Sequence, residues 1–278
     1  MGGMMLITPQ ELNAALGDVV VLDASWHMPD TRRDGNAEFL AEHIPGARRF
    51  DVDAIADTTS GLPHTLPSPE MFAEMIGALG IANDSKVVVY ETGRPFAAPR
   101  AWWMFRVMGH DALVLDGGLT AWKALGYPVE QGEPARPAPA TFVPHFRPEL
   151  FADGDKVATV LESGGVVADA RAAERFEGRV EEPRPGLRSG HMPGARNVPF
   201  VNLIGEDGRL KDEAGLRAAF TEAGVDLSQP VVTTCGSGVT ASVLSFALER
   251  IGTPSAVYDG SWTEWGGDTA RPVVKGPA

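Results

Sequence analysis

An internal repeat constrains the fold of this chain more than any other feature. VVVLDAS at 19–25 resembles GVVADAR at 165–171, and EHIPGAR at 42–48 matches GHMPGAR at 190–196. KVVVYE at 86–91 matches PVVTTC at 230–235, and VLDGGLTAW at 114–122 matches VYDGSWTEW at 257–265. The four matches keep the same order at a nearly constant offset. The 278 residues therefore predict a tandem pair of domains rather than a solenoid.

The join between the two copies is marked by proline. Residues 131–148 hold Pro134, Pro137, Pro139, Pro144 and Pro148. Because proline lacks an N–H group and fixes φ near −65°, this stretch predicts a semi-extended linker. We expect one domain at residues 1–130 and the other at 149–278.

Apolar runs alternate with helical patterns in both copies. Runs typical of strands buried on both faces lie at 19–22, 87–90, 113–115, 166–168, 231–234 and 256–258. A capping box opens a helix at Thr8 and a Ser-Pro pair opens another at Ser68. Further helical patterns lie at 99–108, 120–125, 213–223 and 239–251. This alternation predicts α/β domains, each a mainly parallel sheet flanked by helices, with ligands beyond the C-terminal strand ends.

Composition excludes several classes of protein. With 24 Lys and Arg against 37 Asp and Glu, the net charge of −13 argues against binding to nucleic acid or to an anionic membrane. One cysteine makes neither an internal disulfide nor a multi-cysteine zinc site, and no histidines have metal-type spacing. The chain shows no signal-peptide pattern and no apolar run of about 20 residues. We therefore expect a cytoplasmic protein without a metal.

The lone cysteine, Cys235, directly follows the predicted strand 231–234 and starts the loop CGSGVTA at 235–241. Glycines allow a tight loop with inward N–H groups, and the next helix turns its positive end to the same space. Both effects favour a nucleophilic thiolate. The alternative is a small buried apolar residue. The first copy has Glu91 at this place, so only the second copy can be a thiol enzyme.

At these residues the sequence resembles the tandem rhodanese-fold sulfurtransferases, over almost the whole chain. The resemblance rests on CGSGVTA, EHIPGAR, DVDAIAD at 51–57, PHTLPSPE at 63–70, APRAWWMFRVMGH at 98–110, SGHMPGARNVPF at 189–200 and YDGSWTEWG at 258–266. The loop is most similar to that of 3-mercaptopyruvate sulfurtransferases. Thiosulfate-preferring members typically carry a CRKGVT-type loop, with cationic residues where this chain has Gly236 and Ser237. One departure is Arg94, an unusual charge in the first-domain loop YETGRPFAAPR.

The resemblance implies two tandem rhodanese-like domains, the first degenerate, and a reaction without a cofactor. Cys235 would take the sulfur of 3-mercaptopyruvate as a persulfide and release pyruvate. The sulfur would then pass to cyanide or to a thiol acceptor such as thioredoxin.

The resemblance also implies roles for particular residues of this chain. Arg175 and Arg184 would bind the substrate, a task for which the planar guanidinium fork suits carboxylate oxygens. Ser237 would polarise the substrate or relay a proton, together with His64 and Asp53. The loop N–H groups would stabilise the thiolate and the persulfide; they belong to Gly236, Gly238, Val239 and Thr240.

Two alternatives remain beside this reading. A thiosulfate:cyanide sulfurtransferase shares the fold and the cysteine. A catalytically silent sulfur-carrier or binding module would accept sulfur from a donor protein without releasing pyruvate. A phosphatase of this fold needs a C-x5-R loop, but the sixth residue after Cys235 is Ala241. The sequence also lacks the G-x-S-x-G, P-loop and dinucleotide-binding motifs.

Overall fold

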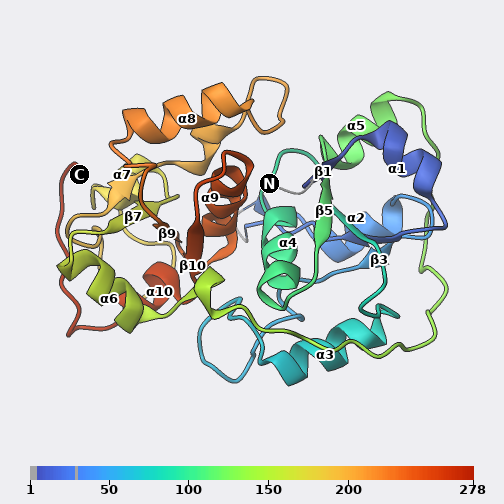
Figure 1. Ribbon diagram of the computed structural model, residues 1–278, viewed down its shortest axis with the longest axis horizontal. Coiled ribbons are helices and arrows are strands. Elements are labelled where there is room, and N and C mark those ends of the chain that lie inside the picture. Colours follow the sequence, from blue (N-terminus) through green and yellow to red (C-terminus); the bar gives the residue numbers. More distant parts are fainter. Residues whose placement is uncertain (1–4, 29–30) are drawn as a thin grey trace. The chain divides into compact units, whose positions relative to one another are not determined.

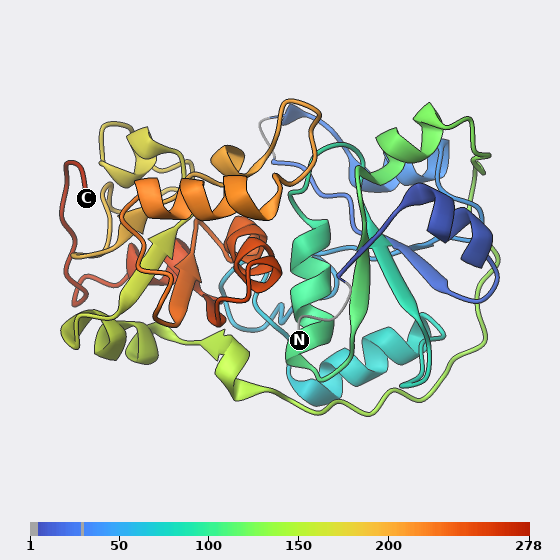
Figure 2. The same cartoon turned by 45° about the horizontal axis from the view of Figure 1, so that its top comes forward.

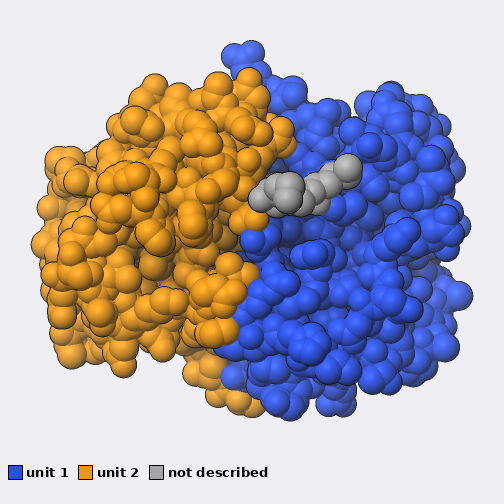
Figure 3. Space-filling view, in the orientation of Figure 1, with its two compact units in different colours: residues 1–57, 66–147, 206–209 blue, residues 58–65, 148–205, 210–278 orange. Residues whose placement is uncertain are grey.

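A computed structural model describes residues 5–28 and 31–278 of the chain (Figure 1). Met1–Met4, at the start of the stretch tested for a signal peptide, lie outside the described residues. Contacts group the chain into two compact units, coloured separately in Figure 3. Unit 1 comprises Met1–Asp57, Leu66–Arg147 and Glu206–Arg209, and unit 2 comprises Thr58–Thr65, Pro148–Gly205 and Leu210–Ala278.

Unit 1 contains a five-stranded sheet in which every neighbouring pair is parallel. The strand order is β1-β5-β4-β2-β3. The strands are β1 (Leu6–Ile7), β2 (Val20–Asp23), β3 (Arg48–Arg49), β4 (Val87–Tyr90) and β5 (Ala112–Leu115). All four residues of β4 are buried, as the continuous apolar run predicts for a strand covered on both faces.

In the described part of unit 1, the helices that cover the two faces of this sheet are α1 (Pro9–Ala15), α2 (Gly35–Ala41), α3 (Pro69–Ala78), α4 (Ala98–Val107) and α5 (Gly118–Ala124). Leu12, Phe39 and Trp122, from α1, α2 and α5, share one core. On the other face α4 packs against β4 and β5, and its Phe105 contacts Phe72 of α3. Figure 2 shows α1 and α5 on one side of the strands and α4 on the other. The predicted capping box at Thr8 is present and begins α1.

Unit 2 has a second five-stranded sheet, also parallel throughout, in the order β6-β10-β9-β7-β8. Its strands are β6 (Phe151–Ala152), β7 (Val166–Asp169), β8 (Arg196–Asn197), β9 (Val231–Thr234) and β10 (Ser255–Tyr258). Its helices are α6 (Gly154–Glu162), α7 (Ala173–Phe176), α8 (Glu213–Glu222), α9 (Val239–Arg250) and α10 (Ser261–Trp265), with 3-10 turns at Pro148–Leu150 and Phe200–Leu203. Residues of α6, α7 and α10 share one core, whereas α8 packs on α9 and α9 on β9 and β10.

The two sheets have the same strand order once the second copy is aligned with the first, so the predicted duplication and the predicted α/β class are confirmed. Residues 131–147 contain neither helix nor strand. The prediction missed the two-residue strands, and it also missed α2, α6, α7 and α10. Strands of two residues carry too short a pattern to be distinguished from loops.

Each half of the sequence contributes one segment to the other compact unit. Thr58–Thr65, shortly before the α3 N-cap Ser68, belongs to unit 2. Glu206–Arg209, shortly before the α8 N-cap Asp212, belongs to unit 1. These segments occupy corresponding places in the repeat. Within the described part of the chain, no helix has both the length and the apolar character needed to cross a membrane.

Candidate functional site

Cys235 lies at the C-terminal end of β9, where a ligand is expected in a parallel sheet. Its side chain is a free thiol and the residue is 2% exposed. Gly238 adopts a left-handed φ of 82°, which favours glycine, and serves as the N-cap of α9. The first N–H groups of this twelve-residue helix have no partner within the helix, so the loop lies at its positive end.

The segment after β10 fixes the backbone of the cysteine loop. The Cys235 N–H donates to Ser261 Oγ at 3.2 Å, and the Trp262 N–H donates to the Cys235 carbonyl at 3.0 Å. Thr263 donates twice to the Gly236 carbonyl, from its N–H at 2.9 Å and from its hydroxyl at 2.6 Å. The thiol is therefore carried on a loop tied to two neighbouring strand ends.

Two guanidinium groups converge on the residue after the cysteine. A Cβ built on Gly236 would lie 3.2 Å from Nη2 of Arg175 and 3.9 Å from Nη1 of Arg184. Arg175 comes from α7, and its side chain is 22% exposed. The structure thus brings together Cys235 and both arginines that the resemblance implied, and positive charge gathers beside the loop.

Buried charges hold Arg175 in this place. Its Nη2 donates to Glu182 Oε2 at 2.5 Å, and Arg171 Nη1 donates to Glu182 Oε1 at 2.9 Å. Arg171 also donates to Asp169 at 2.7 Å and lies 4.2 Å from the ring centroid of Trp262. Burial disfavours a charged guanidinium, but the carboxylates of Asp169 and Glu182 outweigh it and raise the pKa of Arg171. Arg171 is therefore a fixed cation.

His64 and Ser237 form a buried polar pair within unit 2. His64 Nδ1 lies 2.9 Å from Ser237 Oγ, and the two residues are 6% and 7% exposed. His64 adopts a φ of 62°, which is uncommon outside glycine. Asp53, the third member of the implied relay, belongs to unit 1, where its Oδ2 accepts the Trp26 indole N–H at 2.9 Å.

The corresponding loop of unit 1 carries Glu91 in place of the cysteine. Its carboxylate accepts the N–H groups of Phe96, Ala97 and Ala98 at 2.7, 2.8 and 3.0 Å. Burial raises the pKa of Glu91 to about 7, and the three N–H groups oppose that shift. In this copy the loop N–H groups therefore bind a side chain of the loop itself.

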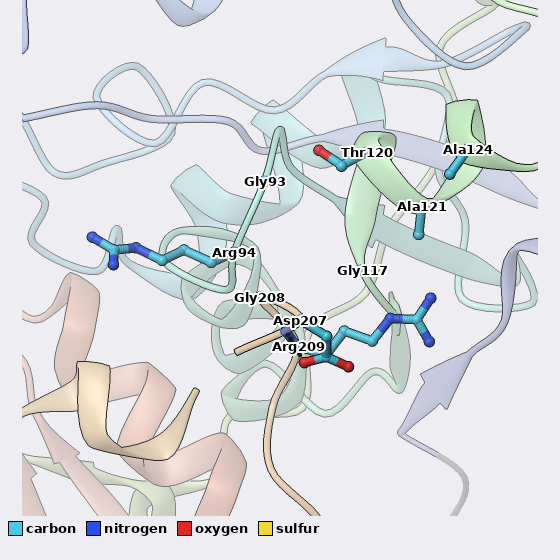
Figure 4. A pocket seen from close by; sticks show the side chains of 9 residues that line it. All are labelled: Gly93, Arg94, Gly117, Thr120, Ala121, Ala124, Asp207, Gly208 and Arg209. Carbon is cyan, nitrogen blue, oxygen red and sulfur yellow. Dashed lines mark hydrogen bonds between the residues drawn. The ribbon is translucent and has the colours of Figure 1, made fainter. Parts of the chain in front are cut away.

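A cavity of about 380 Å³ adjoins the Glu91 loop in unit 1 (Figure 4). It is lined by Gly93, Arg94, Gly117, Thr120, Ala121, Ala124, Asp207, Gly208 and Arg209. Arg209 forms an ion pair with Asp116 at 2.9 Å. In Figure 4 the guanidinium groups of Arg94 and Arg209 point away from one another. The unit 1 cavity therefore lacks the convergent cations of unit 2.

Sequence reasoning assigned no role to Glu182 or to Arg171. The available signal was two consecutive glutamates, Glu181 and Glu182, between Arg175 and Arg184. Trp262 and Trp265, which follow β10, are buried. In residues 5–28 and 31–278, no three His, Cys, Asp or Glu side chains form a group that could hold a metal ion.

The rhodanese-like domain model matches the chain twice, at residues 8–125 and 153–268. The 3-mercaptopyruvate sulfurtransferase of Homo sapiens is 43% identical over 250 residues, which cover 88% of this chain and 84% of that one. The thiosulfate sulfurtransferase of Cricetulus griseus is 46% identical over 251 residues, with the same coverage. The crystal structure of SseA from Escherichia coli, described as a 3-mercaptopyruvate sulfotransferase, has a TM-score of 0.85 and 38% identity and covers 94% of this chain and 99% of its own.

Both copies of the repeat fall within these matches, and the resemblance seen at the cysteine loop is confirmed. The chain belongs to the rhodanese-like domain family, as a tandem pair of such domains.

Proposed function

We propose that this protein is a 3-mercaptopyruvate sulfurtransferase with Cys235 as its nucleophile. The observation that carries the proposal is the approach of two guanidinium groups to Gly236, the residue that follows Cys235 at the end of a parallel strand. A sulfur donor that also bears a carboxylate matches this combination. The relatives named 3-mercaptopyruvate sulfurtransferase support the same substrate.

The reaction has two steps at one sulfur atom. The Cys235 thiolate attacks the thiol sulfur of 3-mercaptopyruvate, the carbon–sulfur bond breaks, and the electron pair leaves on the enolate of pyruvate. Protonation of that enolate yields pyruvate, and Cys235 carries the persulfide. Attack by cyanide or an acceptor thiol, thioredoxin being one candidate, on the outer sulfur regenerates the thiolate.

Arg175 and Arg184 bind the substrate carboxylate and keto oxygen and orient the donor sulfur toward Cys235. Gly236, Gly238, Val239 and Thr240 contribute backbone N–H groups that stabilise the thiolate and the persulfide. This role is supported by the position of the loop at the N-terminus of α9.

Ser237 and His64 handle the proton of the leaving enolate, a role supported by their 2.9 Å contact. The relay role of Asp53 rests on the resemblance alone. We also propose the domain division at residues 1–130 and 149–278, and a cytoplasmic location.

The experiment compares pyruvate release from 3-mercaptopyruvate with thiocyanate release from thiosulfate, using cyanide as the acceptor for both. We expect a large advantage in kcat/KM for 3-mercaptopyruvate and no turnover by Cys235→Ser. The relative from Cricetulus griseus, named a thiosulfate sulfurtransferase, makes thiosulfate a specific alternative substrate. A preference for thiosulfate would leave Cys235 as the proposed nucleophile but refute 3-mercaptopyruvate as the substrate. No turnover of either donor, with sulfur accepted from a donor protein, would indicate a silent carrier.

A further inference from the structure

We propose that Glu182 is a positioning residue that holds the Arg175 guanidinium against the cysteine loop, in the space left by the absent side chain of Gly236. Glu182 touches neither the thiol nor its loop in the contacts described above. It acts through Arg175, so the proposal rests on the anion-binding role of that arginine.

Glu182 is anchored more firmly than the arginine it holds. Its side chain is 1% exposed, and its Oε1 accepts from Arg171, a residue that is itself buried. Arg171 donates to both Asp169 oxygens and to the Gly190 carbonyl at 2.9 Å. Arg171 therefore holds the Oε1 atom of Glu182, and the Oε2 atom accepts from Arg175.

Trp262 connects this support to the cysteine loop. Its ring lies against the Arg171 guanidinium, and its N–H donates to the Cys235 carbonyl at 3.0 Å. Arg171, which holds Glu182, and the cysteine loop thus contact the same residue, the first through its indole ring and the second through its backbone N–H. The 2.5 Å contact from Glu182 to Arg175 Nη2 then defines where that guanidinium lies relative to the thiol.

Gly236 limits the position of Arg175 from the other side. A Cβ at residue 236 would lie 3.2 Å from Arg175 Nη2, closer than most real Cβ contacts. Because Glu182 holds the same nitrogen, Arg175 has little room to withdraw without loss of its ion pair. The glycine is therefore a specificity feature: it lets a carboxylate-bearing sulfur donor meet Arg175 beside the thiol.

Two substitutions that leave the net charge unchanged test this arrangement, one at Glu182 and one at Gly236. Glu182→Asp keeps the charge but shortens the reach to Arg175 by one methylene. Gly236→Ala leaves Glu182 intact and adds a Cβ that displaces the Arg175 guanidinium from the cysteine loop. Glu181→Asp makes the same chemical change at the adjacent exposed glutamate and is the matched control.

The readout is alkylation of Cys235, the one cysteine of the chain, by iodoacetate and by iodoacetamide. The two reagents share a leaving group and a reacting carbon, but only iodoacetate carries a carboxylate. The ratio of their rates therefore cancels changes in thiol reactivity and exposure. We expect Arg175→Ala to lower this ratio about tenfold, and the two test variants to lower it roughly threefold. The same variants should raise the KM for 3-mercaptopyruvate more than they lower kcat.

The decisive comparison repeats each substitution in the Arg175→Ala background. If Glu182 and Gly236 act through Arg175, neither change should lower the ratio further there. An unchanged ratio in the single variants, an equal fall in Glu181→Asp, or an additive fall in the Arg175→Ala background would overturn the proposal. If Glu182→Asp unfolds, Glu182→Gln, which keeps the length of the side chain, takes its place in the same comparison. The wild-type protein could turn over no sulfur donor while its ratio of iodoacetate to iodoacetamide rates still falls in the Glu182, Gly236 and Arg175 variants. That result would refute the proposed function and leave this inference standing.

Discussion

Glu91 allows a prediction about pH and stability in unit 1. Its pKa rises from 4.5 to about 7 in the folded protein, chiefly because the carboxyl group is buried. A raised carboxyl pKa means that folding favours the protonated form. The stability that this group provides is therefore fully present below pH 4.5 and is lost as the pH rises through about 7.

The magnitude follows from the shift. One pKa unit corresponds to about 1.4 kcal/mol, so the wild-type protein should lose about 2–3 kcal/mol from this group between roughly pH 5 and pH 8. Glu91→Gln cannot ionise and should lack that loss. Glutamine has one acceptor oxygen for three N–H groups, which costs about 1–2 kcal/mol at every pH. The offset does not change the pH dependence.

The assay is equilibrium urea unfolding of the wild type and Glu91→Gln from pH 5 to pH 8. Groups that titrate alike in both proteins cancel in the difference between their free energies of unfolding. As the pH rises, the free energy of unfolding of the glutamine variant should increase relative to that of the wild type. Glu70→Gln is the control: hydrogen bonds lower the pKa of this exposed carboxyl below 4.5, so the difference between the wild type and that variant should stay nearly constant from pH 5 to pH 8. A constant difference for Glu91→Gln would refute the reasoning.

Three further predictions concern the site in unit 2. Arg175→Ala should lower kcat/KM for 3-mercaptopyruvate by a factor that corresponds to about 1–3 kcal/mol of transition-state stabilisation. An unchanged kcat/KM in steady-state kinetics would show that Arg175 does not belong to the site. Because His64 and Ser237 share a hydrogen bond, His64→Gln and Ser237→Ala should each lower kcat, and the double variant should lose less than the product of the single losses; independent losses would separate their roles. Replacement of Gly236-Ser237 by Arg-Lys should shift the ratio of the two kcat/KM values toward thiosulfate, since it adds two cations and the side chain at residue 236 displaces Arg175; an unmoved ratio would contradict this explanation of substrate choice.

The central part of the fold was predictable from the sequence because it rests on local patterns. Continuous apolar runs located β4 and β9, and the aligned repeat carried the same topology from one copy to the other. The position of Cys235 followed from the strand and the glycines around it. The two-residue strands and α7 escaped prediction because they have almost no periodicity and are stabilised by their tertiary neighbours.

Contacts between polar side chains of different loops and turns were beyond this reasoning. Glu182 lies in a polar stretch that looks like a solvated surface, and nothing in its local sequence indicates a side chain that is 1% exposed. The pairing of His64 with Ser237 spans 173 positions and was reached only through a family resemblance. Single-sequence patterns report periodicity, not which loops meet.

The compact unit that contains Cys235 includes a segment of the first repeat, and this segment carries His64. Thr58–Thr65 is encoded before the linker but belongs to the unit that contains Cys235. A protein cut at the linker would therefore yield a C-terminal fragment with its thiol, its arginines and its loop, but with Ser237 deprived of the histidine that meets it at 2.9 Å. The repeat that holds Glu91 in place of the thiol thus still supplies a side chain that contacts Ser237 in unit 2.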